Sequence, residues 1–134
     1  MRRAHRSPLS RQAVEILAAL KRITGRGTLA FPSVRTVREP LSENTFNAAL
    51  RRLGYGTDEM TAHGFRATAS TLLNESGKWH PDAIERQLAH VEGNDARRAY
   101  ARGEHWAERV EMMQWWADTL DELRAEVPVR MAAE

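Results

Sequence analysis

Several segments of this sequence have the apolar periodicity of an α-helix, and each begins with a capping residue and ends at a glycine. Serine and threonine side chains accept hydrogen bonds from the first turn of a helix, and glycine adopts the left-handed backbone that commonly ends one. Residues 10–25, 42–54 and 61–77 follow this pattern. Pro81 suits the first position of a fourth helix, a short fifth helix is expected over 97–102, and a long last helix over about 104–126. The sequence therefore predicts a mainly α fold with at most a short N-terminal strand.

The apolar residues of these segments indicate which faces should be buried. In the first helix they recur in helical rhythm from Ala13 to Ile23, so we expect a core helix. Met112, Trp115, Trp116 and Leu123 widen the apolar stripe of the last helix. The other residues expected to point inward are Phe46, Ala49, Leu50 and Leu53, then Phe65, Ala69, Leu72 and Leu73, and finally Trp106, Val110, Met113, Ala117 and Leu120.

Length and composition bound the class of protein. A chain of 134 residues is long enough for one core, so we expect a single domain over residues 1–126 and a tail over 127–134. Without cysteine it can form neither a disulfide nor a thiolate metal site, which suits a cytoplasmic protein. It has no apolar run of about 20 residues, the length that spans a bilayer, so no membrane partner is expected.

Positive charge is concentrated in the first half of the chain. Residues 1–66 contain 12 basic and 5 acidic residues, a net charge of +7, whereas residues 67–134 contain 8 and 13, a net charge of −5. Such asymmetry is typical of a protein that presents one side to a polyanion such as DNA. The candidate DNA-binding residues are Arg3, Arg35, Arg38, Asn44, Asn47, Arg51 and Arg52.

Two imidazoles, a guanidinium and a phenol occur within residues 61–100: His63, Arg66, His90 and Tyr100. Residues three apart lie on one face of a helix, so His63 and Arg66 can converge on one ligand. Arginine offers a fork of donors that matches two phosphate oxygens, and histidine can accept a proton near neutral pH. A phenol, with an ordinary pKa of about 10, becomes a nucleophile when a base or a cationic field assists it. The set suits chemistry on a phosphodiester.

The arrangement of these residues resembles the phage-integrase family of tyrosine recombinases. The motifs are H-G-F-R at 63–66, L-A-H at 88–90 and a tyrosine ten residues later, and the likeness to integrases of genomic islands and satellite phages extends to about Leu123. It implies a helical catalytic domain that acts on double-stranded DNA at an attachment site, together with other recombinase protomers in a synaptic complex. The resemblance implies neither a metal nor another cofactor.

The resemblance also implies a role for each motif residue. Tyr100 would attack the scissile phosphate to give a 3′-phosphotyrosine and a free 5′-hydroxyl. Arg66 and His90 would hold the non-bridging oxygens, and His63 would take or share the phenolic proton. Family members commonly lend a C-terminal segment to a neighbouring protomer, so an exposed part of the last helix would be a protein interface.

Three departures from the family pattern stand out. Ala89 replaces the glycine that many members have before the second histidine, which is a small-for-small change. The family's first catalytic arginine and its catalytic lysine both belong upstream of the segment matching Pro8 to Ser10, and neither has a counterpart in this sequence. The resemblance therefore implies the C-terminal part of a catalytic domain, truncated at its N-terminus.

Other interpretations remain open from the sequence. A catalytically deficient integrase remnant could act only by binding DNA or another recombinase. A helix-turn-helix regulator would suit the basic half, but it leaves His63, His90 and Tyr100 unexplained. Four histidines lie between positions 63 and 105, yet they are not at i, i+4 spacing and no cysteine or paired carboxylate accompanies them, so no metal site is predicted. For each basic helix or loop, a solvated exterior is the alternative to DNA contact.

Overall fold

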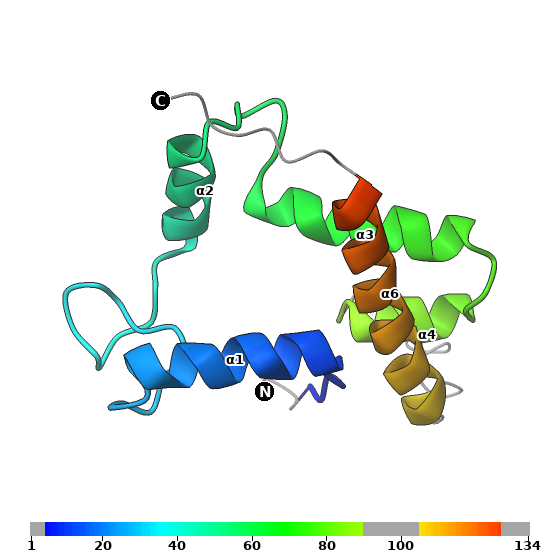
Figure 1. Ribbon diagram of the computed structural model, residues 1–134, viewed down its shortest axis with the longest axis horizontal. Coiled ribbons are helices and arrows are strands. Elements are labelled where there is room, and N and C mark those ends of the chain that lie inside the picture. Colours follow the sequence, from blue (N-terminus) through cyan, green and yellow to red (C-terminus); the bar gives the residue numbers. More distant parts are fainter. Residues whose placement is uncertain (1–4, 90–104, 127–134) are drawn as a thin grey trace, which may run out of the picture.

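The computed structural model describes residues 5–89 and 105–126, and these residues are mainly helical (Figure 1). Their only β-type pairing is an isolated antiparallel bridge between Pro32 and Pro40, so the predicted mainly α class is confirmed. None of the described helices combines the length and the apolar character that crossing a membrane requires. The helices are α1 (Arg11–Thr24), α2 (Glu43–Arg52), α3 (Ala62–Glu75), α4 (Pro81–Gln87) and α6 (Trp106–Glu126).

The helix boundaries follow the local signals in the sequence. The hydroxyl of Ser10 accepts a hydrogen bond from the Ala13 amide at the start of α1, and the Thr61 hydroxyl accepts one from the third residue of α3. Gly54 follows α2 with φ +93° and Gly77 follows α3 with φ +62°, the left-handed conformation that glycine adopts without steric cost. Both kinds of signal act within one turn of the helix end, which is why the sequence reveals them.

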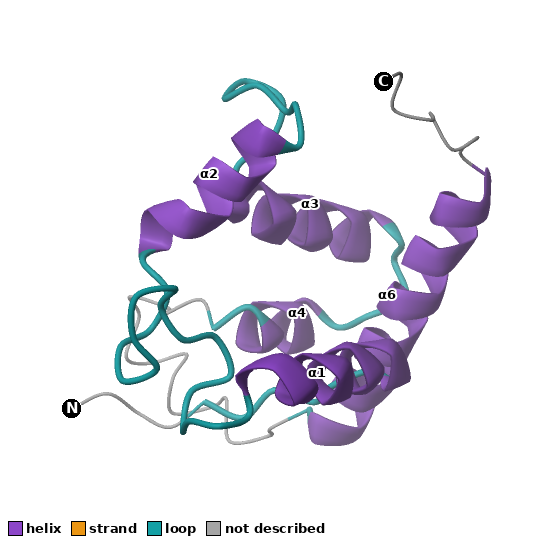
Figure 2. Cartoon of the chain, turned by 60° about the vertical axis from the view of Figure 1, so that its left-hand side comes forward, coloured by secondary structure: helices purple, strands orange, loops and turns teal. Residues whose placement is uncertain are grey.

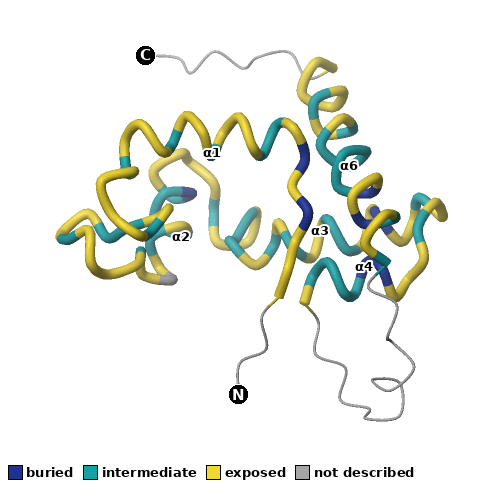
Figure 3. Tube along the Cα trace, turned by 90° about the horizontal axis from the view of Figure 1, so that it is seen from below, coloured by how far each residue is buried: buried dark blue, intermediate teal, exposed yellow. Residues whose placement is uncertain are grey.

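The hydrophobic core lies where α3, α4 and α6 meet (Figures 1 and 3). Leu73 from α3, Ile84 from α4 and Met112 from α6 are almost completely buried against one another. Partly buried apolar residues surround them: Trp79, Leu88, Trp115 and Trp116. The core therefore fixes the second half of α3, in which Leu73 lies, against the other two helices.

The expectation that α1 is a core helix is wrong. It has no buried residue, and the side chains of Val14, Ile16 and Ile23 are 52%, 67% and 79% exposed (Figure 3). It makes polar contacts with α6: the side chain of Gln12 donates to Asp118 Oδ1 over 2.7 Å and accepts from the side-chain amide of Gln114 over 3.0 Å. A polar edge of α1 therefore contacts α6. The periodicity of its apolar residues predicted the wrong packing face.

The inward faces predicted for α2 and α3 are only partly right. Leu50 and Leu73 are buried as expected. In contrast, Phe46 is 49%, Leu53 74% and Phe65 55% exposed. Other described residues cover only part of each helix. The apolar stripe of α2 and of α3 is longer than that part, so some of its residues remain exposed.

The buried face of α6 also differs from the predicted one. Trp106, Val110 and Leu120 were expected to face the core, yet each is more than two-fifths exposed, whereas Met112 and Arg109 are buried. The guanidinium of Arg109 donates to the backbone carbonyl of Arg6 over 2.6 Å and to the side-chain oxygen of Gln87 over 3.0 Å. The periodicity of apolar residues does not predict a buried arginine whose donors have partners of this kind. The buried face of α6, which includes Arg109, therefore differs from the face that its apolar residues define.

Candidate functional site

His63 and Arg66 lie together on the first two turns of α3, as their spacing predicts. They line an open pocket of about 280 Å³ with three further residues of the same helix face, Ala67, Ser70 and Thr71. The imidazole of His63 is exposed and Arg66 is half-buried. The pocket thus combines a cation, a proton acceptor and two hydroxyls, a set that can bind an anion such as phosphate.

The start of α3 is fastened to α2 by side chains. Asn47 accepts a hydrogen bond from the Ala62 amide over 2.8 Å, and the guanidinium of Arg51 donates to the Met60 carbonyl. The Thr61 cap adds a hydrogen bond from the Gly64 amide, so the backbone is held both before and after His63. Asn47 and Arg51 were predicted as DNA-binding residues, and the structure gives their side chains this additional positioning role.

Sequence reasoning missed this link because the two partners are far apart along the chain. Asn47 and Ala62 are separated by 15 positions, and a mid-helix asparagine carries no local signal that it will cap another helix. A partial signal was present, since asparagine is a poor helix former and two asparagines lie in the short α2.

The other candidate DNA-binding residues are distributed over the loop before α2 and over α2 itself. Arg35, Arg38, Asn44 and Arg52 are exposed, so their side chains are accessible to a ligand. The loop that carries the first two is closed by a 2.7 Å hydrogen bond from the Ser33 amide to the Glu39 carbonyl. Arg3 lies outside the described residues.

A second pocket of similar volume lies between α1 and the loop that follows it. It is lined by Leu17, Leu20, Lys21, Thr24, Gly25, Gly27, Thr28, Leu29 and Ala30. Lys21 is the only ionisable residue of its lining, so this pocket has a cation but no histidine or carboxylate that could accept a proton. The chemistry-bearing residues therefore favour the α3 pocket as the candidate site.

Comparison with known proteins identifies the family. A model of the phage integrase family matches residues 1–105 of the chain, a stretch that includes both motif histidines, the motif arginine and Tyr100. The chain belongs to the phage integrase family. The resemblance to tyrosine recombinases that the sequence motifs indicated is thereby confirmed.

Several curated integrases are similar to this family member. The integrase of Enterobacteria phage P4 is 52% identical over 123 residues, which are 90% of this chain and 28% of that protein. Prophage integrase IntA of Escherichia coli K12 is 47% identical over 88% of this chain and 28% of its own length. The integrase of Shigella phage Sf6 is 40% identical over 90% and 31%. The chain thus spans less than a third of the length of these relatives, and no solved structure matches it.

Two of the four predicted catalytic residues of this integrase-family chain, His90 and Tyr100, lie outside the described residues. The described chain approaches them through α4, whose last residue is Gln87 and whose C-cap is Leu88. It resumes at His105, directly before α6. The structure therefore brings His63 and Arg66 together, and the roles of all four residues stay predictions.

Ala89, the last residue before His90, explains a feature of the motif. Its φ is +52°, in the left-handed region that favours glycine. A Cβ atom in this conformation approaches the following carbonyl oxygen and costs about 1–2 kcal/mol. The glycine that many family members have at this position is thus the residue its backbone prefers, and the alanine here is more than a neutral small-for-small change.

We expect Ala89→Gly to stabilise the protein by about 1 kcal/mol, because it removes this steric cost. Ala18→Gly is the matched control: Ala18 lies at an exposed mid-helix position of α1, where glycine should lower the free energy of unfolding by about 1 kcal/mol. Urea denaturation followed by circular dichroism measures both changes. Equal destabilisation by the two substitutions would contradict the left-handed assignment of Ala89.

Proposed function

We propose that this chain supplies part of the active site of a site-specific DNA recombinase that breaks and rejoins strands through a 3′-phosphotyrosine. The observation that carries the proposal is the pairing of His63 with Arg66 on one open polar pocket of α3, in a chain of the phage integrase family. A phosphate in this pocket could meet a guanidinium, an imidazole and the hydroxyls of Ser70 and Thr71.

In the proposed reaction, the phenolic oxygen of Tyr100 attacks the scissile phosphorus. A bond forms between this oxygen and phosphorus while the bond from phosphorus to the 5′ oxygen breaks. The departing oxygen takes a proton, which the family's upstream lysine would supply, so the products are a 3′-phosphotyrosine and a 5′-hydroxyl. His63 takes or shares the phenolic proton, and Arg66 and His90 stabilise the charge on the non-bridging oxygens. Attack by the 5′-hydroxyl of another strand reverses the step and completes recombination. The bond energy is kept in the phosphotyrosine, so no nucleotide or metal is needed.

The polar contacts at the start of α3 support this division of roles. His63 is exposed and can reach a substrate, while Thr61, Asn47 and Arg51 hold the backbone that carries it. A catalytic base must lie within hydrogen-bond reach of the proton that it takes, so a fixed backbone at this turn favours catalysis.

The proposed partners are double-stranded DNA and other recombinase protomers. DNA would lie along the basic half of the chain, where Arg35, Arg38 and Arg52 are exposed. Contacts with protomers would use the apolar surface at the end of α6, where Leu120 and Leu123 are 45% and 46% exposed. Trp115 and Trp116, which belong to the same apolar stripe of the last helix, pack partly against the core.

DNA binding should depend on the exposed arginines and on salt. Each phosphate contact releases counterions, so the logarithm of the binding constant should fall linearly with the logarithm of salt concentration, by about 0.9 per contact. Arg52→Glu should weaken binding of duplex DNA and reduce this slope. Arg124→Glu, at an exposed position on α6 beside Asp121, is the matched charge reversal and should have little effect. Fluorescence anisotropy at several salt concentrations measures both, and a salt-independent affinity would contradict the electrostatic assignment.

Covalent capture tests the catalytic proposal. These 134 residues alone should form a protein–DNA adduct slowly on nicked DNA carrying an attachment site. The family's upstream arginine and lysine have no counterpart in them, and each such group typically contributes about 100-fold to 1000-fold in rate. Fusing the upstream part of the phage P4 integrase catalytic region to the chain should restore rapid adduct formation. Both Tyr100→Phe and Arg66→Ala should suppress the adduct in that fusion.

The outcomes of this experiment separate the two functional hypotheses. An adduct that persists in Tyr100→Phe would exclude Tyr100 as the nucleophile. A fusion that binds DNA but forms no adduct would favour a module that only binds DNA or a recombinase. Rapid adduct formation by the 134 residues alone would show that the upstream groups are dispensable.

A further inference from the structure

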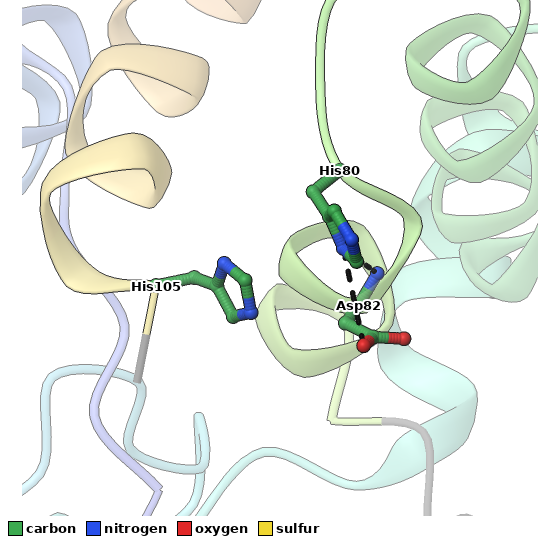
Figure 4. Close-up of side chains that lie close together, drawn as sticks. All are labelled: His80, Asp82 and His105. Carbon is green, nitrogen blue, oxygen red and sulfur yellow. Dashed lines mark hydrogen bonds and ion pairs between the residues drawn. The ribbon is translucent and has the colours of Figure 1, made fainter. Parts of the chain in front are cut away.

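Two histidines and two carboxylates meet where α4 and α6 begin, outside the pocket that His63 and Arg66 line on α3. His80 is the N-cap of α4, and His105 directly precedes α6, 25 positions later in the chain. Figure 4 shows the side chains of His80 and Asp82 next to each other and the ring of His105 extending toward them from the start of α6. The rings of the two histidines stack with their centroids 5.1 Å apart. One ring nitrogen of each histidine and a carboxylate oxygen of Asp82 lie within 4.8 Å of one another.

Glu108 orients this group from behind. One of its carboxylate oxygens accepts the backbone N–H of His80 over 2.6 Å, and the other lies 3.0 Å from Nδ1 of His105. The hydrogen bond from the His80 backbone lowers the pKa of Glu108, and its contacts with His105 lower it further, against a smaller opposing effect of burial. A carboxylate at this distance holds the ring of His105 in its orientation.

We propose that His80, Asp82 and His105 form a binding site for a divalent transition-metal ion of the Zn²⁺ class. Two imidazole nitrogens and one carboxylate oxygen are a donor set that favours Zn²⁺ over Mg²⁺ or Ca²⁺, which prefer oxygen ligands. A histidine whose other ring nitrogen is held by a carboxylate is the arrangement found behind many zinc ligands. With three protein ligands, a fourth position is left for water.

The distances require only a small closure. Zinc–nitrogen bonds of about 2.0–2.1 Å place two donors of one tetrahedral ion about 3.3 Å apart, compared with separations of up to 4.8 Å here. The side chains of His80 and Asp82 are 56% and 49% exposed, so they are free to rotate by the amount needed. Nδ1 of His80 now accepts the Asp82 amide over 3.1 Å, and binding through either ring nitrogen gives up this capping bond, which lowers the affinity.

A bound ion would join two parts of the chain that are distant in sequence. His80 and Asp82 lie at the start of α4 and His105 at the start of α6, and the charges of Asp82 and Glu108 would offset the two charges of the ion. Binding to the folded chain alone raises its stability by mass action, so Zn²⁺ should raise the melting temperature. This inference needs no catalysis and is therefore independent of the proposed function.

The test uses the 134-residue chain without a histidine tag, dialysed against a chelator that is then removed. Titration calorimetry with Zn²⁺ should show one ion per chain at about pH 7.5 and weaker binding as the pH is lowered, because protons compete with the metal for its ligands. Co²⁺ should give the intense visible absorption of a four-coordinate site. Neither signal would be expected if the cluster were only a set of hydrogen bonds.

Variants assign the signal to the cluster. His105→Gln and Asp82→Asn should each weaken Zn²⁺ binding by at least about tenfold. His80→Asn removes the imidazole and keeps a good N-cap, so it should lose binding while the helix content stays that of the native chain. His5→Gln, a change at an exposed histidine outside the cluster, should bind as the native chain does. No binding by the native chain, or equal binding by all four variants, would overturn the proposal.

Discussion

The hydrogen bond from the Ala62 amide to Asn47 holds the end of α3 on which the candidate site depends. Figure 2 shows α2 beside the first turns of α3, with α6 toward the other end of that helix. The core fixes α3 only in its second half, where Leu73 packs against α4 and α6. His63 and Arg66 lie two to three turns earlier, beyond that core. Their backbone is positioned by polar contacts with α2 and by the Thr61 cap, so hydrogen bonds contribute to the geometry of the site.

This arrangement divides the predicted DNA-binding residues of α2 into two groups. Asn47 and Arg51 face α3 and fasten it, whereas Asn44 and Arg52 are exposed. The same short helix can therefore position the His63–Arg66 pocket on one side, while the other side carries the exposed polar groups that we propose to contact DNA. A ligand that binds the exposed side would act on the element that holds the pocket.

The sequence predicted those features of the fold that depend on neighbouring residues. Ser10, Thr61 and Gly77 act within one helical turn, so helix starts and ends could be identified, and the spacing of His63 and Arg66 placed them on one face. Features that depend on distant partners could not be predicted. The buried Arg109 meets a carbonyl 103 positions away, the polar packing of α1 on α6 spans a similar separation, and His80 reaches the carboxylate of Glu108 across 28 positions.

Amide hydrogen exchange in Asn47→Ala tests most directly whether α2 holds the site. The Gly64 amide keeps its Thr61 acceptor in this variant, so it reports opening of the turn without losing its own partner. Loss of a hydrogen bond worth about 1 kcal/mol should speed exchange of the Gly64 amide about fivefold and leave exchange of the Leu73 amide unchanged. In the control variant Arg52→Ala, which changes an exposed residue of α2, exchange at Gly64 should stay as in the native chain. Unaltered exchange at Gly64, or equal acceleration at Gly64 and Leu73, would contradict the account.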